Sequence, residues 1–251
     1  FQSEREPQNP FYQIYLMDLL TGKSHRISPG VGKTTCAYVN PMNNHRIIFS
    51  STHLDPDTNK KAQAEIESQK DASKDSSTKK KYSWSYDENY DIFETDESEK
   101  SIGKLSGKLS GKLANTKFKR LTKELGYDAE GSYSPDGKHI VFASNREAYA
   151  HKMSPEDQKI FDMDQSYMMD IYVMNSDGSN VKRLTTEKGY DGGPFYSADG
   201  KMITWRRFSP DGRVAEIMVM SADGTNQRAV THLGAMSWAP YFHPSNDYLI
   251  F

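Results

Sequence analysis

Short apolar runs of strand length recur along the chain, and polar turns separate them. The runs "HIVFAS" (139–144) and "DIYVMN" (170–175) are rich in β-branched and aromatic residues. Between them lie sequences such as "SPDGK" and "NSDGSN", in which Gly137 and Gly178 can adopt a positive φ without a Cβ clash. This pattern predicts antiparallel strands joined by tight hairpin turns.

The turns belong to a larger repeat. The segment "GYDAEGSYSPDGKHIVFASNR" (126–146) returns as "GYDGGPFYSADGKMITWRR" (189–207), and weaker copies stand at 32–51 and 234–251. A second part, "MDIYVMNSDGSNVKRLT" (169–185), has its own copies elsewhere, at 12–28, at 215–231 and, split, at 90–96 and 118–122. Repeats of this size predict an all-β propeller with four-stranded antiparallel blades, whose strands we name a to d from the innermost outward.

The repeat also sets the expected extent of the propeller. Equivalent aromatic residues of strand b are Phe1, Phe49, Phe142, Trp205 and Phe251, and the shortest interval is 46 residues, from Trp205 to Phe251. Four repeats are visible, and the chain begins and stops at the end of a strand b. Residues 1–251 are therefore expected to be part of a six- or seven-bladed propeller. The alternative is a closed four-bladed ring in which the first strands pair with the last.

Three insertions interrupt the blades. Residues 51–89 follow a strand b and are polar, which predicts a short helix and then a mobile lid. Residues 146–168 predict a helical lid, with a helix over 155–163 that Ser154 caps and Pro155 begins. Residues 97–117 replace a c–d turn on the opposite face and are expected to be flexible, because glycines recur through them.

Composition excludes several classes of function. The 251 residues carry a net charge of −2, which argues against binding to nucleic acid or to a membrane surface through bulk charge. No apolar run is long enough for a membrane span, and the single cysteine, Cys36, excludes an internal disulfide framework. The sequence also lacks G-x-S-x-G, H-E-x-x-H and C-x-x-C motifs, so no catalytic residues are assigned.

One constellation of side chains suggests a ligand site. The b–c and d–a connections of a blade emerge on the same face, so residues at these connections should surround the channel mouth there. The candidate ligand-binding residues are Asp128, Glu130, Asp191, Ser237, His53, Arg146, His151, Arg206 and Arg207. Carboxylates such as Asp128 and Asp191 could hold a divalent cation such as calcium, and the arginines could bind a peptide or sugar carboxylate. In the structural alternative, the aspartates cap backbone amides in their Gly-Tyr-Asp turns and the arginines pair with them.

The "SPDGK", apolar strand, "SNR" signature and the "DIYVMNSDGSNVKRLT" signature resemble the WD40-like repeats of the TolB β-propeller family and of propellers attached to some peptidases. The resemblance covers nearly all of the chain outside the insertions. It implies a periplasmic or extracellular bacterial protein of the envelope, a scaffold that binds a protein or peptide on its insertion-bearing face, alone or as the accessory domain of a peptidase. The alternative is a metal-dependent propeller enzyme such as an oligogalacturonate-type lyase. That enzyme needs a histidine cluster for its metal, and the seven histidines are scattered along the repeats.

Overall fold

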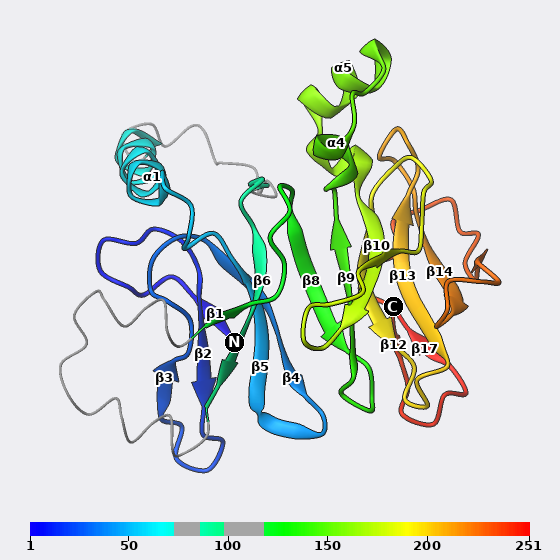
Figure 1. Ribbon diagram of the computed structural model, residues 1–251, viewed down its shortest axis with the longest axis horizontal. Helices are drawn as coiled ribbons and strands as arrows, with labels where there is room; N and C mark the ends of the chain where they lie inside the picture. Colours follow the sequence, from blue (N-terminus) through cyan, green and yellow to red (C-terminus); the bar gives the residue numbers. More distant parts are fainter. Residues whose placement is uncertain (73–85, 98–117) are drawn as a thin grey trace.

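A computed structural model describes residues 1–72, 86–97 and 118–251 of the chain. Its sheets stand side by side in chain order, each a blade whose strands run antiparallel to their neighbours (Figure 1). The strands of blade 1 are β1 (Gln2–Ser3), β2 (Gln13–Met17) and β3 (Ser24–Arg26). Those of blade 2 are β4 (Thr34–Asn40), β5 (Asn43–Ser51), β6 (Asp91–Asp96) and β7 (Lys119–Arg120).

The next two blades repeat this order from strand a to strand d. Blade 3 contains β8 (Asp128–Tyr133), β9 (His139–Ser144), β10 (Asp170–Asn175) and β11 (Lys182–Arg183). Blade 4 contains β12 (Asp191–Tyr196), β13 (Met202–Phe208), β14 (Ala215–Ser221) and β15 (Arg228–Ala229). Blade 5 is the hairpin of β16 (Tyr241–Phe242) and β17 (Leu249–Ile250). These sheets confirm the predicted propeller blades, and their number and order are those of part of a propeller.

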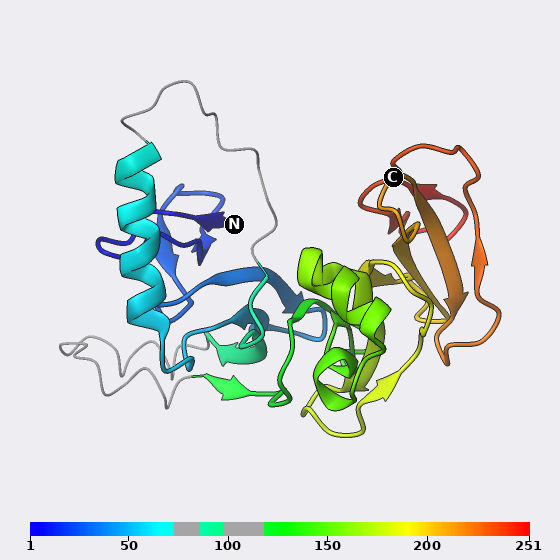
Figure 2. The same ribbon diagram turned by 90° about the horizontal axis from the view of Figure 1, so that it is seen from above.

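The first and last sheets do not complete each other. The strands β1, β2 and β3 form one sheet and β16 and β17 form another, and Figure 2 shows them at opposite ends of the row of blades. The closed four-bladed ring is therefore not the arrangement observed among the described strands.

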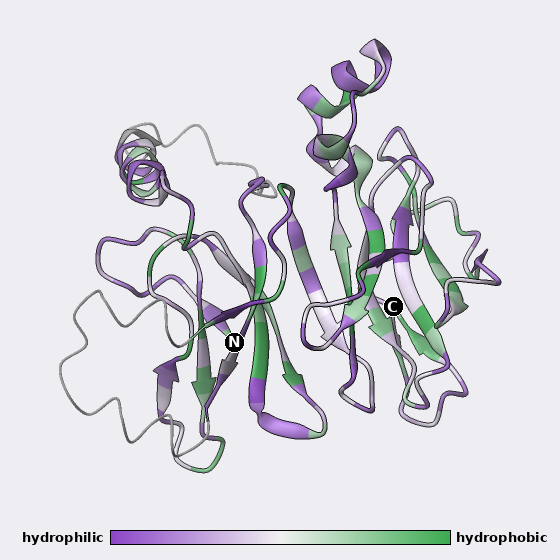
Figure 3. Cartoon of the chain, viewed as in Figure 1, coloured by the Kyte–Doolittle hydropathy of each residue, from purple (hydrophilic) through white to green (hydrophobic). Residues whose placement is uncertain are grey.

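The hydrophobic core lies in the layers between neighbouring blades. Ile14 and Ile27 of the first blade pack with Phe49 and Phe93 of the second. Further clusters join blade 2 to blade 3 and blade 3 to blade 4, the latter around Trp205. Figure 3 shows hydrophobic segments along the strands and hydrophilic ones along the helices above them. The apolar runs of the sequence are buried on both faces because each blade is covered by two others.

Strand d is short and is held to strand c by a repeated polar contact. In blade 3, Arg183 lies 2.5 Å from the Asp170 carboxylate, and the Thr185 hydroxyl donates to the same side chain over 3.2 Å. Blade 2 repeats the arrangement with Asp91 and Arg120. Burial raises the pKa of Asp170 to about 7, while Arg183 opposes this shift. The "RLT" ending of the repeat thus encodes a contact that closes the blade.

Strand a carries a β-bulge at the same place in each blade. The residues at this position have left-handed backbone, with φ of 55° at Cys36, 57° at Glu130, 61° at Gly193 and 51° at Ala239. The register of strand a against strand b shifts at the bulge in blades 2, 3 and 4. These are the residues that the repeat aligns two positions after the start of strand a, so the bulge is part of the repeat itself.

The helices of the described chain all follow strand b, in the two insertions on one face (Figure 1). Helix α5 (Pro155–Met163) matches the predicted range, and Ser154 accepts a hydrogen bond from the Asp157 amide over 3.1 Å. A short helix α4 (Glu147–Ala150) precedes it and a 3₁₀ turn η1 (Gln165–Met168) follows it. None of these described helices is long and apolar enough to cross a membrane.

Helix α1 (Thr58–Ala72) occupies the first insertion and is held at its start by charge. The Lys61 ammonium lies 2.7 Å from Asp55 and 2.9 Å from Asp87, and both carboxylates are buried. The mobile tract that the sequence predicts after this helix lies largely at 73–85, outside the described residues. The flexible segment predicted at 97–117 also lies outside them, apart from Glu97.

Candidate ligand pocket

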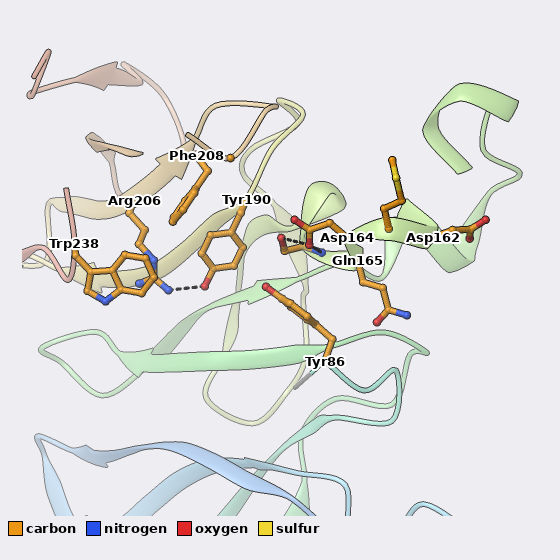
Figure 4. A pocket seen from close by; sticks show the side chains of 11 residues that line it. Tyr86, Asp162, Asp164, Gln165, Tyr190, Arg206, Phe208 and Trp238 are labelled. Carbon is orange, nitrogen blue, oxygen red and sulfur yellow. Dashed lines mark hydrogen bonds between the residues drawn. The ribbon is translucent and has the colours of Figure 1, made fainter. Parts of the chain in front are cut away.

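A pocket of about 560 Å³ opens on the insertion-bearing face, between the lid that follows β9 and the upper ends of blades 4 and 5. Its walls combine aromatic rings with a few polar side chains (Figure 4). The lining residues are Tyr86, Asp162, Met163, Asp164, Gln165, Ser166, Tyr190, Arg206, Phe208, Gly212 and Trp238. A concave site with this mixture can enclose a side chain of a ligand.

Arg206 forms the base of the pocket and connects three blades. Its side chain leaves β13 and is only 5% exposed. One terminal nitrogen donates to Glu130 of blade 3 over 2.9 Å and lies 2.5 Å from the Tyr190 hydroxyl. The guanidinium carbon also lies 4.3 Å from the ring centre of Trp238, in the segment that enters blade 5. Stacking and a buried ion pair therefore fix the guanidinium in one orientation.

Glu130 supplies the acceptor of this network from its bulge position. Its carboxylate accepts the Gly193 amide of the next blade over 2.6 Å and the Tyr190 hydroxyl over 2.8 Å. Burial raises the pKa of Tyr190 well above its ordinary value, so the phenol keeps its proton and can donate to Glu130. The network thus joins the bulges of blades 3 and 4.

Two glycines make this network sterically possible. A Cβ at Gly192 would lie 2.3 Å from the Tyr190 hydroxyl oxygen, and a Cβ at Gly193 would lie 2.2 Å from an Arg206 nitrogen. Gly193 also has a φ of 61°, which favours glycine. The "GYDGG" form of the repeat in blade 4, where blade 3 has "GYDAE", is explained by this crowding.

The opposite wall belongs to the lid. Asp162 is exposed at the end of α5, and Asp164 caps η1 by accepting the Ser166 amide over 2.9 Å. The lid is tied to blade 4 by an ion pair of 2.6 Å between Lys188 and Asp157. Its position above the pocket is therefore set by contacts outside the pocket itself.

Most of the predicted carboxylates and arginines pair within their own blades. Asp128 is fully buried, lies 2.6 Å from Arg146 and accepts the Ser144 hydroxyl over 2.5 Å. Asp191 is also fully buried, and both of its oxygens accept hydrogen bonds of 2.7 Å from Arg207. Burial raises the pKa of both aspartates, and the arginines oppose the shift. This geometry is the pairing of the structural alternative given above, although each aspartate meets arginine and hydroxyl side chains.

The predicted histidines and Ser237 lie apart from the pocket lining. The His53 ring packs 4.3 Å from the ring of Phe93, and burial lowers its pKa to about 4. His151 is exposed and lies 3.5 Å from Glu147. Ser237 is buried next to Trp238. Of the predicted set, Arg206 lines the pocket and Glu130 supports it from behind.

The aromatic walls were absent from the sequence prediction. Trp238, Phe208, Tyr190 and Tyr86 come from different repeats and meet only in space. A signal for Arg206 was nevertheless present. The strand pairing places it opposite Gly192, where the other blades pair Ala143 with Ala129 and Ser50 with Thr35. A large charged residue replaces small ones at this position, which marks blade 4 as different.

The described residues contain no group of three or more histidine, cysteine, aspartate or glutamate side chains arranged to hold a metal ion. Asp128 and Asp191, the predicted cation ligands, each face an arginine at hydrogen-bonding distance. The arrangement can therefore bind a ligand through stacking, hydrogen bonds and charge.

Comparisons with known proteins place the fold. No family model matches the chain. An uncharacterized Agrobacterium fabrum protein is 29% identical over 119 residues, which are 47% of this chain and 40% of that protein. This chain thus spans less than half of that curated relative.

Solved structures resemble the chain over most of its length. A structure assigned as TolB of Agrobacterium tumefaciens aligns with a TM-score of 0.56 and 19% identity, over 94% of this chain and 61% of the other. For TolB of Acinetobacter baumannii the TM-score is 0.55 and the identity 20%, over 96% and 42% of the two chains. The tricorn protease aligns with a TM-score of 0.50 and 11% identity, over 92% and 20%. The chain therefore has the fold of a TolB-like β-propeller.

Proposed function

We propose that this chain is a non-catalytic, exported TolB-like propeller that binds a protein or peptide partner on its insertion-bearing face. The observation that supports the proposal is the pocket formed by Trp238, Phe208, Tyr190 and Tyr86 around the buried Arg206. Tryptophan, tyrosine and arginine are the residues that most often dominate the energy of protein interfaces. The TolB likeness supports a location in the bacterial envelope, where the chain acts alone or as the accessory part of a larger protein.

Preorganisation favours binding at this pocket. Arg206 and Tyr190 are held by Glu130 before any partner arrives, so these side chains lose little conformational entropy on binding. Trp238 is 47% exposed and can bury its outer face against a partner. A partner that covers this ring would gain apolar contact without displacing an internal one.

Peptide display on the purified chain tests the proposal. A library of random peptides would be selected on the wild-type protein, and enriched peptides would be measured by isothermal titration against wild type and Trp238→Ala. We expect dissociation constants in the micromolar range and at least a tenfold weakening in Trp238→Ala, the loss typical of an interface anchor. Circular dichroism would verify that the variant keeps its fold.

A matched control lies on the face of the tight turns. Tyr248 is 54% exposed at the β16–β17 hairpin and stacks on His243. Tyr248→Ala also removes an exposed aromatic ring, and it should leave the affinity unchanged. Selected peptides that lose affinity in Tyr248→Ala but keep it in Trp238→Ala would refute the assignment of this face.

A further inference from the structure

We infer that the pocket accepts a cationic side chain, a lysine or arginine of the bound peptide. This inference rests on the proposed function, because it names the chemistry of the ligand at the same site. It follows from the charges that the pocket presents, from the rings that surround it and from the contacts that each charged group already makes.

The positive charge in the pocket is already compensated. Arg206 pairs with Glu130 over 2.9 Å, and both side chains are buried. The Arg206 guanidinium is also covered by two rings, at 4.9 Å from the ring centre of Tyr190 and at 4.3 Å from that of Trp238. A ligand anion would therefore meet a cation whose charge Glu130 has neutralised.

The negative charge of the lid has no such compensation among the residues that line the pocket. The Asp162 carboxylate accepts a hydrogen bond from the neutral Gln158, and the Asp164 carboxylate accepts from the amide and hydroxyl of Ser166. The ion pair of the lid, between Lys188 and Asp157, involves neither of them. The wall facing Arg206 thus presents two carboxylates to a ligand.

The aromatic rings add to this preference. Phe208 meets Tyr190 edge to face at 5.3 Å and Trp238 at 5.7 Å, so the rings form a connected wall opposite the lid. Aromatic faces attract ammonium and guanidinium groups, and the stacked Arg206 shows that these rings already hold one cation. A second cation, entering between the rings and the lid carboxylates, would be attracted from both sides (Figure 4).

The same charges disfavour an acidic sugar. A uronate brings its own carboxylate, which Asp162 and Asp164 would repel, and Arg206 has no free charge to offset the repulsion. Discrimination by unfavourable like charges is a common basis of specificity. The structure thus favours a basic peptide over an oligogalacturonate at this pocket.

Three peptide pools test the inference. Each pool contains N-acetylated, C-amidated hexapeptides with a neutral dye, random flanking residues and a fixed central lysine, norleucine or glutamate. Fluorescence anisotropy should show the lysine pool binding at least tenfold more tightly than the norleucine pool, and the glutamate pool binding most weakly. Asp162→Asn with Asp164→Asn should weaken the lysine pool about fivefold to tenfold, while the norleucine pool is unchanged.

Asp247→Asn is the matched control, because Asp247 is an exposed aspartate in the last hairpin turn. It should leave all three affinities unchanged. Equal binding of the lysine and norleucine pools, preference for glutamate, or binding of digalacturonate while the lysine pool is silent would overturn the inference. If none of the pools and no displayed peptide binds, the proposed function itself fails.

Discussion

The pair of Asp191 and Arg207 allows a quantitative test of how the blades are stabilised. Asp191 is fully buried and receives two hydrogen bonds of 2.7 Å from Arg207. Replacing only the arginine, by Arg207→Leu, leaves a buried carboxylate without its cation. Breaking such a pair costs about 3–5 kcal/mol, a large part of the 5–15 kcal/mol that stabilises a typical domain.

The second substitution should restore most of this loss. In the double variant Arg207→Leu with Asp191→Leu, no buried charge remains, so its free energy of unfolding should lie within about 1 kcal/mol of wild type. Urea unfolding, followed by tryptophan fluorescence and circular dichroism, measures all three proteins. As a control, Lys201→Ala breaks an exposed pair with Asp199 and should cost less than about 1 kcal/mol.

The dependence on pH supplies an independent check. Burial raises the pKa of Asp191 above its ordinary value of 3.8, and loss of Arg207 should raise it further. A carboxyl group with a raised pKa binds its proton more tightly in the folded protein, so its protonation stabilises the fold. The deficit of Arg207→Leu should therefore shrink as the pH falls through this raised pKa. A loss below 1 kcal/mol at pH 7.5, or a double variant that loses the sum of both single variants, would refute the reasoning.

Three further perturbations address other parts of the molecule. Burial lowers the pKa of His53 to about 4, so the stability it contributes above pH 6.5 should be lost as the pH falls through about 4, and His53→Phe should flatten this slope of the urea midpoint. Gly193→Ala should cost more than about 1 kcal/mol in urea unfolding and disturb Arg206. Gly22→Ala, in an open left-handed turn, should cost less, and equal losses would exclude the steric explanation. Lys61→Met should increase hydrogen exchange in α1 about tenfold or more without affecting the blades, whereas unchanged exchange would show that its ion pairs do not anchor the helix.

The blades could be predicted because their signals are local. A turn such as Pro135 to Lys138 and the apolar run after it specify a hairpin wherever they occur, so aligned repeats indicate strands in the correct order. The same alignment placed Asp128 and Asp191 at equivalent positions, and both pair with arginines of the adjacent strand. These contacts also lie within one hairpin.

The pocket could not be predicted in this way, because its contacts cross between blades. Arg206 meets Glu130 from the preceding blade and Trp238 from the following segment, and no turn or strand signal relates these positions. His53 was placed near the channel mouth by its position after strand b. The structure instead packs its ring against Phe93 and Phe118, because the strand end is followed by an apolar layer.

The left-handed bulge of strand a has a consequence for how such repeats diverge. Its backbone geometry is the same in blades that carry Cys36, Glu130, Gly193 and Ala239, so the side chain there can change while the strand register does not. Each non-glycine residue accepts a backbone cost of about 1 kcal/mol or more at this position. One residue per blade is thus separated from the requirements of folding and becomes a variable letter in an otherwise fixed text. An engineer who wished to connect neighbouring blades differently could rewrite these letters and leave every turn and strand of the repeat in place.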